Sequence, residues 1–108
     1  MTFSIVLRDS EENSFGIAVA TKHFAVGALV PHLRSGVGAV AVQASTNPHL
    51  GLSGLEQLAS GKNIEQALKT VLAEDPEAGL RQLHGLDASG RSWAWSGKQT
   101  KKWAGHQC

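Results

Sequence analysis

The chain opens with two short apolar segments that are separated by a polar one. Phe3–Arg8 (FSIVLR) and Phe15–Thr21 (FGIAVAT) lie on either side of Asp9–Ser14, which is rich in Asp, Asn and Ser. These residue types favour turns because their side chains bond to nearby backbone groups. Two apolar segments joined in this way are typical of antiparallel strands, so the pattern predicts a β-hairpin.

The register of this hairpin can be inferred from the midpoint of its turn. If Arg8 and Phe15 are the last facing pair, Thr2 lies opposite Thr21 and diagonal to Lys22. A slip of one residue would place Thr2 directly opposite Lys22 instead. Either register brings the beginning of the chain and Lys22 to the same end of the sheet.

Two of the predicted strands have apolar side chains at almost every position. Phe15–Thr21 and Gly36–Ala44 (GVGAVAVQA) are made largely of Ile, Val and Ala without strict alternation. Strands of this kind are usually covered on both faces, so we expect a layer on each side of both. Between them, His23–Pro31 is interrupted by Gly27 and ends at a proline, which favours a loop or a short strand over a helix.

Two helices are expected next, and each has its own capping signal. Ser53 with Glu56 predicts a capping box for a short helix that ends at Gly61. Asn63 with Gln66 repeats this signal for a second helix, which ends before a proline. The apolar residues of the second helix recur at i, i+3, i+4, i+7 and i+8 and form one stripe, consisting of Ile64, Ala67, Leu68, Val71 and Leu72.

A second hairpin is predicted toward the end of the chain. Leu80–Leu86 and Arg91–Ser96 flank Asp87–Gly90 (DASG), which is a favourable turn sequence. The predicted order is three strands, two helices and two strands. This order indicates a single α+β domain over residues 1–108, with its helices segregated from a mostly antiparallel sheet.

The composition gives no reason to expect a nucleic-acid or membrane partner. The chain has 108 residues and a formal net charge of +1, so its charge gives no reason to expect a nucleic-acid partner. Its longest apolar stretch, Gly36–Val42, is far too short to cross a membrane. Cys108 is the only cysteine, which excludes an internal disulfide and suits a reducing compartment. We therefore expect a cytoplasmic protein without a nucleic-acid or membrane partner.

The residues do not call for a metal or a cofactor. The five histidines show neither H-x-H nor H-x-x-x-H spacing, and no carboxylates cluster with them in the sequence. Gly36-x-Gly38 lies within a predicted strand and does not open a helix, so it does not predict a phosphate-binding loop. We expect neither a metal site nor a cofactor.

Thr2 is the first candidate for chemistry because of its position. Its small side chain allows Met1 to be removed, and Thr2 would then carry both a hydroxyl and a free α-amine. Such an amine titrates near ~8 and can take the proton of the hydroxyl, which activates the hydroxyl as a nucleophile. A nearby ammonium such as that of Lys22 would keep the amine neutral and stabilise developing negative charge. The alternative is that Thr2 simply begins a strand, as β-branched residues often do.

Five blocks of the sequence, in order, resemble one family of uncharacterised proteins. They are MTFSIV at Met1–Val6, FAVGALVP at Phe24–Pro31, GVGAVA at Gly36–Ala41, TNP at Thr46–Pro48 and WAGH at Trp103–His106. This family is the domain of unknown function 1028, which is grouped with the N-terminal-nucleophile (Ntn) hydrolases. Its members continue well past the last block. The chain therefore looks like roughly the first half of the family domain, truncated at the C-terminus.

The resemblance implies both a fold and an activity. The implied fold is an Ntn-hydrolase-like αββα sandwich, in which two stacked sheets are faced by helices, and the implied reaction is hydrolysis of a small amide or other C–N bond. Carried over to this chain, it implies Thr2 as the nucleophile after removal of Met1 and Lys22 as its electrostatic partner. Gln43 and Asn47, at the polar end of the third predicted strand, are candidates for oxyanion or substrate contacts. The expected partner is a small-molecule substrate.

A second hypothesis is that the chain has the same fold but no catalytic activity. Met1 blocks the amine of Thr2 for as long as it is present. A half-length domain would also leave apolar surface and strand edges exposed. These features favour a non-catalytic binding or assembly module that functions as a homo-oligomer.

Overall fold

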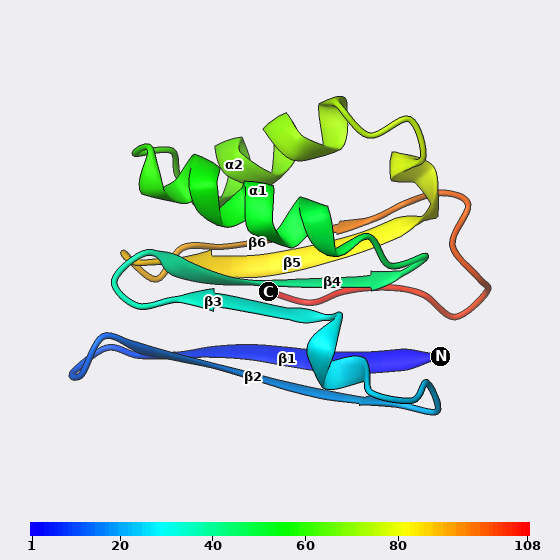
Figure 1. The fold of residues 1–108 in the computed structure, drawn as a ribbon, viewed down its shortest axis with the longest axis horizontal. Coiled ribbons are helices and arrows are strands. Elements are labelled where there is room, and N and C mark those ends of the chain that lie inside the picture. The colour runs from blue at the N-terminus through cyan, green and yellow to red at the C-terminus, as the bar shows by residue number, and fades with distance from the viewer.

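The computed structural model describes residues 1–108, with six strands, two α-helices and two 3-10 turns along the chain (Figure 1). The strands are β1 (Thr2–Asp9), β2 (Ser14–Thr21), β3 (Pro31–Arg34), β4 (Gly38–Ala44), β5 (Arg81–Asp87) and β6 (Ser92–Ser96). The helices are α1 (Pro48–Ala59) and α2 (Ile64–Ala73), and the 3-10 turns are η1 (Val26–Ala28) and η2 (Ala78–Leu80). Neither α-helix is long and apolar enough to cross a membrane.

The elements stack in three layers (Figure 1). β3, β4, β5 and β6 form an antiparallel sheet in that order, and α1 and α2 cover one face of it. β1 and β2 form a separate antiparallel hairpin that lies across the other face. The fold is therefore α+β, with antiparallel sheets and two helices on one side, as the sequence predicts.

The main core lies between the helices and the four-stranded sheet. The apolar stripe of α2 is buried there as predicted, and it packs in one cluster with Val40 and Val42 of β4. Every residue of β4 except Ala44 is buried, which confirms that this strand is covered on both faces. Burying these side chains, at about 25 cal/mol per Å² of apolar surface, holds β4 and β5 in place. The side chains on the opposite face of these strands, toward the hairpin, therefore have a rigid support.

The first hairpin has the first of the two registers considered from the sequence. Arg8 pairs with Phe15, and Thr2 pairs with Thr21. Directly opposite residues of an antiparallel pair point to the same face, so Thr2 and Thr21 both lie on the inner side, toward the four-stranded sheet. The beginning of the chain is thus one residue away from Lys22 in the strand pairing.

The prediction that Phe15–Thr21 is covered on both faces is wrong. Residues of β1 and β2 alternate between partly buried and exposed positions. The exposed side of β1 carries Phe3, Ile5 and Leu7, whose exposed fractions are 72%, 43% and 58%. The exposed side of β2 carries Gly16, Ala18 and Ala20, which pair with them. The apolar run in the sequence reflects this outer hairpin face, which no other part of the 108 residues covers.

The first helix begins earlier than the sequence predicts. Asn47 is the N-cap of α1, and its side-chain oxygen accepts a hydrogen bond from the backbone N–H of His49 at 3.2 Å. Pro48 suits the first helical position because a donor at that position would have no partner within the helix. The start predicted at Ser53 is wrong, since Ser53 lies inside the helix.

The capping signal of α2 is confirmed by the structure, whereas the start of β3 differs from the sequence prediction. α2 has the predicted capping box, in which Asn63 and Gln66 each accept a hydrogen bond from the other's backbone N–H. β3 is not predicted as a strand of its own, because Pro31 is the expected end of the preceding apolar run, whereas in the structure it begins the strand. β3 lies at the edge of its sheet, where a residue without an N–H donor is tolerated.

Candidate functional site

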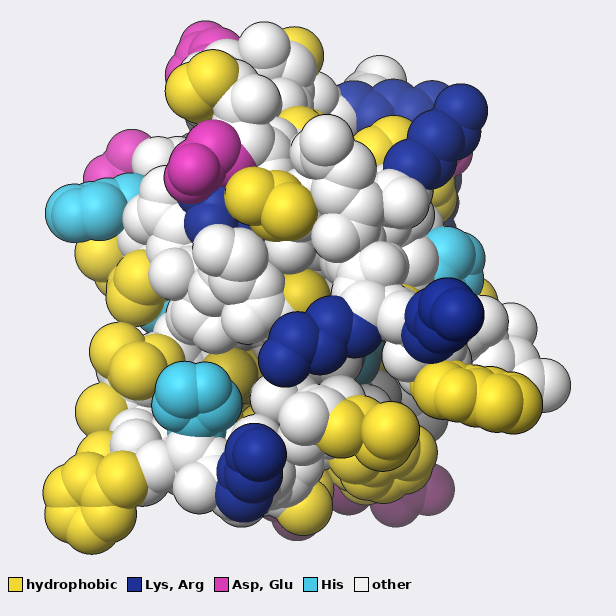
Figure 2. Space-filling model, turned by 90° about the vertical axis from the view of Figure 1, so that its right-hand side faces the viewer, with side chains coloured by type: hydrophobic (Ala, Val, Ile, Leu, Met, Phe, Trp, Pro, Cys, Tyr) yellow, Lys and Arg dark blue, Asp and Glu magenta, His cyan; other side chains and the backbone are white.

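The predicted site residues gather at the end of the molecule where β1 begins. β4 reaches this end with Gln43 and Ala44, and the inner side of β1 contacts β4 and β5. Figure 2 looks at this end and shows Lys, Arg and hydrophobic side chains spread over it, with acidic side chains mostly near the helices at the top. The site therefore lies between two layers, at their open end.

Thr2 forms hydrogen bonds through both its hydroxyl and its carbonyl. Its Oγ1 donates to Oγ1 of Thr21 at 3.1 Å, and the Thr21 hydroxyl donates in turn to the carbonyl oxygen of Met1 at 3.1 Å. The carbonyl oxygen of Thr2 accepts from Nε2 of Gln43 at 3.4 Å. The structure thus brings Thr2 and Gln43 together. Because Met1 is attached, the nitrogen of Thr2 is an amide and does not act as a base.

A second set of hydrogen bonds continues from Gln43 into the space between the two sheets. Oγ of Ser4 donates to Oε1 of Gln43 at 2.6 Å, and it lies 2.6 Å from Nε2 of His84. His84 pairs with Ala41 across β4 and β5, so it shares the hairpin-facing side with Gln43. Sequence reasoning missed Ser4 and His84. For Ser4 the available signal is a polar residue at an inward-facing position of the apolar run Phe3–Leu7, whereas His84 lies among other polar residues of β5 and has no such signal.

His84 is held in its uncharged form by its surroundings. Burial between the sheets lowers the pKa of His84, and the positive charge that His106 can carry lowers it further. His106 comes from the segment that follows β6, and its Nδ1 lies 3.0 Å from Oγ of Ser96. A neutral imidazole has one nitrogen that donates and one that accepts, so its contact with Ser4 has a defined direction.

The other two predicted site residues form no hydrogen bond with Thr2. Lys22 follows Thr21 directly, is exposed, and forms no hydrogen bond or ion pair. Asn47 uses its side-chain oxygen to cap α1, which leaves its amide N–H groups as donors. The roles of Lys22 and Asn47 at the site stay predictions.

Comparison with known proteins identifies the family. The model of the family of unknown function DUF1028 matches residues 2–108. The chain belongs to this family. A crystal structure of the DUF1028 protein SPO2555 from Silicibacter pomeroyi is similar to it, with a TM-score of 0.92 and 31% sequence identity over 96% of this chain and 46% of that chain. The chain therefore spans about half the length of that relative. No curated protein matches it.

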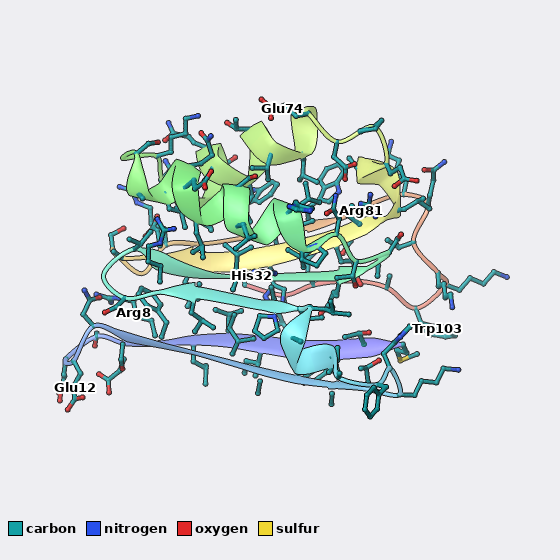
Figure 3. All side chains as sticks on the ribbon, viewed as in Figure 1. Arg8, Glu12, His32, Glu74, Arg81 and Trp103 are labelled. Carbon is teal, nitrogen blue, oxygen red and sulfur yellow. The ribbon has the colours of Figure 1, made fainter.

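In this DUF1028 chain, a buried ion cluster fixes the same end of the four-stranded sheet. Arg81, the first residue of β5, is only 4% exposed and donates to Asp75 at 2.8 Å and to Glu77 at 2.6 Å. Its Nη1 also donates to the carbonyl oxygen and to Oγ of Ser45, directly after β4, at 2.7 and 3.0 Å. Figure 3 shows Arg81 between the sheet and the helical layer. The hydrogen bond from Arg81 lowers the pKa of Asp75 against the opposite effect of burial.

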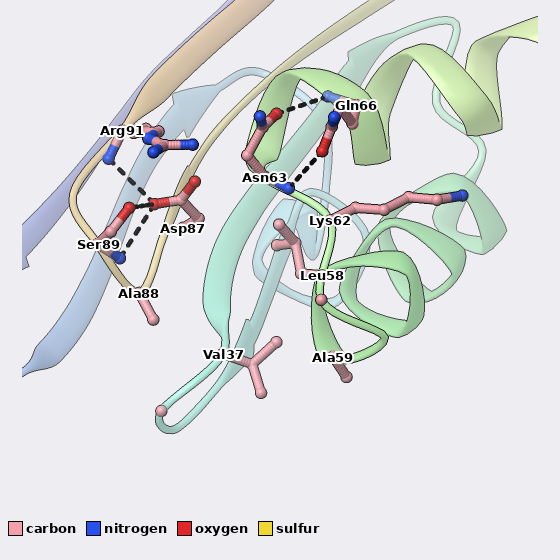
Figure 4. A pocket seen from close by; sticks show the side chains of 12 residues that line it. Val37, Leu58, Ala59, Lys62, Asn63, Gln66, Asp87, Ala88, Ser89 and Arg91 are labelled. Carbon is pink, nitrogen blue, oxygen red and sulfur yellow. Dashed lines mark hydrogen bonds between the residues drawn. The ribbon is translucent and has the colours of Figure 1, made fainter.

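A cavity of about 380 Å³ lies at the opposite end of the DUF1028 chain, where the turns of the sheet meet the connection between the helices (Figure 4). The side chains of Asp87, Asn63 and Gln66, which line it, are already paired. Burial alone would raise the pKa of Asp87, but hydrogen bonds from Ser89, Ile64 and Arg91 outweigh it and lower the pKa. The Lys62 ammonium donates to side chains of α1 and α2. No predicted site residue lines this cavity, and no three His, Cys, Asp or Glu side chains of the chain gather where they could hold a metal ion.

Proposed function

We propose that this chain is the nucleophile-bearing part of an Ntn-type hydrolase, which cleaves a small amide or other C–N bond with Thr2 once Met1 has been removed. The observation that carries this proposal is the setting of Thr2, whose hydroxyl is bonded to Thr21 and whose carbonyl is bonded to Gln43. The layer order helix, sheet, sheet supports an Ntn-like fold, because an αββα sandwich has this order with one further helical layer.

Removal of Met1 would change the chemistry of Thr2 in two ways. It converts the amide nitrogen of Thr2 into an amine that can accept a proton. It also takes away the Met1 carbonyl, to which the Thr21 hydroxyl donates in the present chain. The Thr21 hydroxyl would then lie beside the new amine as well as beside the Thr2 hydroxyl. The Thr21 hydroxyl would thus position both the hydroxyl and the amine of Thr2, between which the proton is transferred.

The proposed reaction has two steps. Oγ1 of Thr2 bonds to the substrate carbonyl carbon while its proton passes to the α-amine, and the amine then protonates the leaving nitrogen as the C–N bond breaks. Water next hydrolyses the resulting ester, with the amine again taking a proton and returning it to Oγ1 of Thr2. Lys22 would stabilise the negative charge that develops on the carbonyl oxygen, and N–H groups of Gln43 or Asn47 would donate to that oxygen.

Removal of Met1 is expected to switch acyl transfer on. We expect the Met1-free chain to release a burst of p-nitrophenol from p-nitrophenyl acetate, at a rate at least about 100-fold above that of the chain that retains Met1, because a positioned general base contributes about that much. Intact mass identifies the two forms, and stopped-flow absorbance measures the burst. Equal bursts from the two forms, or no burst from either, would contradict the proposal.

The outer hairpin face supports a second candidate, a non-catalytic binding or assembly module that functions as a homo-oligomer. Phe3, Ile5 and Leu7 form an uncharged exposed surface there. Contiguous apolar patches of this kind mark interaction surfaces. A second copy of the chain could cover this face.

The oligomeric state, measured by light scattering, tests the assembly-module candidate. It predicts a dimer or larger assembly for the unmodified chain, and a shift of Leu7→Lys toward the monomer because a lysine charge would be buried in the contact. Leu52→Lys is the matched control, since Leu52 of α1 is exposed to a similar extent, 52% against 58% for Leu7, on the other side of the molecule. A monomer at all concentrations, or equal effects of the two substitutions, would rule it out.

A further inference from the structure

The hydrogen bonds that join Thr2 to His84 run in one direction only. A backbone carbonyl can only accept, so Gln43 must turn its amide N–H toward Thr2 and its oxygen toward Ser4. That oxygen takes the single hydroxyl proton of Ser4. Nε2 of His84, 2.6 Å from Oγ of Ser4, must then be the donor in its own contact. The carbonyl of Thr2 thus decides which ring nitrogen of His84 carries the proton, three hydrogen bonds away.

We propose that His84, Ser4 and Gln43 form a one-way hydrogen-bond relay that positions Thr2 for nucleophilic attack. The inference rests on the proposed function, because the exact placement of Thr2 matters for catalysis only if Thr2 is the nucleophile. In this role all three side chains act on Thr2, and a contact of Gln43 with substrate would be a separate role of its other N–H. They are positioning residues.

Thr2 needs such support once it becomes the first residue of the chain. Terminal residues are poorly ordered unless something ties them down. Apart from strand pairing with Thr21, the Gln43 amide is the only group bonded to the backbone of Thr2 from another layer. That bond, at 3.4 Å, is long and weak by itself. Two shorter contacts support it: Ser4 to Gln43 and Ser4 to His84, both at 2.6 Å. They fix the orientation of the Gln43 amide group and polarise it, which strengthens its hydrogen bond to Thr2.

The rigid layer beneath the hairpin gives the relay a fixed anchor. Gln43 is 7% exposed on β4, and His84 lies on β5, and both strands are held by the helix-covered core. No fully buried side-chain nitrogen or oxygen lacks a hydrogen-bond partner. Because burial favours the neutral form of His84, the relay orients Thr2 without placing a charge beside its amine.

The test uses the Met1-free chain and four substitutions. Ser4→Ala removes the middle hydroxyl, Gln43→Met removes the amide but keeps a side chain of similar length, and Ser4→Thr keeps the hydroxyl. Ser96→Ala is the matched control, since Ser96 bonds Gln82 and His106 and lies outside the relay. Three quantities are measured: the NMR order parameter of the Thr2 methyl group, the ring nitrogen of His84 that carries the proton, and kcat and KM for p-nitrophenyl acetate.

The relay predicts a specific set of results. The proton of neutral His84 lies on Nε2 in the unmodified chain. Ser4→Ala and Gln43→Met lower the order parameter of the Thr2 methyl and lower kcat by about 10- to 100-fold at unchanged KM, because small misplacements of a reacting group have effects of this size. Ser4→Thr restores both quantities, and Ser96→Ala changes neither.

Failure of the relay and failure of the proposed function give different results. An unchanged Thr2 order parameter in both Ser4→Ala and Gln43→Met, or a proton on Nδ1 of His84, would overturn the relay even if the chain is a hydrolase. A lowered order parameter with rescue by Ser4→Thr would support the relay as a device that orders Thr2. If the unmodified Met1-free chain then showed no acyl transfer, the hydrolase proposal would fall while the ordering of Thr2 stood.

Discussion

Replacing Thr2 by alanine in the Met1-free chain is expected to lower the rate of acyl transfer about 10³-fold or more, as loss of the nucleophile does in known acyl-transfer enzymes. The α-amine, Lys22 and Gln43 would all still be present, but no atom would remain to form the ester. The rate is measured as the burst of p-nitrophenol from p-nitrophenyl acetate. Removal of Met1 must be confirmed by mass for both chains.

Thr2→Ser is the control for this substitution, because serine keeps the hydroxyl and loses only a methyl group. We expect it to retain a burst within about 10-fold of the unmodified chain. Thr2→Ala removes one hydrogen bond, to Thr21, so its free energy of unfolding should fall by only about 1 kcal/mol. A Thr2→Ala chain with an unchanged burst would contradict the assignment of the nucleophile.

The largest effect on stability is expected at Arg81. Arg81→Met would leave the carboxylate of Asp75, which is 5% exposed, buried without its partner. Breaking a buried pair in this way lowers the free energy of unfolding by about 3–5 kcal/mol. Urea unfolding followed by tryptophan fluorescence measures the loss. Since the Arg81 bond lowers the pKa of Asp75, the pair stabilises the fold near neutral pH, and this contribution is lost as the pH falls through the lowered pKa.

Glu77→Gln is the matched control for Arg81→Met. Glu77 bonds the same guanidinium, but its side chain is 60% exposed. Exposed ion pairs contribute about 0–1 kcal/mol, so the control should stay within that range. If Arg81→Met were no more destabilising than Glu77→Gln, the buried cluster would not be what holds β5 to the end of β4.

Local patterns in the sequence were sufficient for some parts of the fold. The register that pairs Thr2 with Thr21 follows from a short polar turn between two strands, because the pleat has a strict period of two. The stripe and capping box of α2 involve only residues a few positions apart. The start of α1 was harder to predict because the sequence contains two possible N-caps. The helix begins after Asn47, at Pro48, and not at Ser53.

The parts that could not be predicted depend on how layers stack. The apolar character of Phe15–Thr21 is the same whether its outer side meets a helix or is left exposed, so sequence alone does not distinguish the two. Ser4 and His84 are 80 positions apart and meet only because the hairpin folds over β5. Gln43 was a candidate because of its place at the end of a strand and the family resemblance, but its bond to Thr2 could not be predicted from either.

The claim that Thr2 is the nucleophile is tested most directly by locating the acyl group. The Met1-free chain is mixed with p-nitrophenyl acetate, stopped during the burst, digested and mapped by mass spectrometry. The account predicts an acetyl ester on the hydroxyl of Thr2, which disappears with time as water hydrolyses it. A burst-phase acetyl group on Ser4, Lys22 or any other side chain, with Thr2 unmodified, would contradict the account.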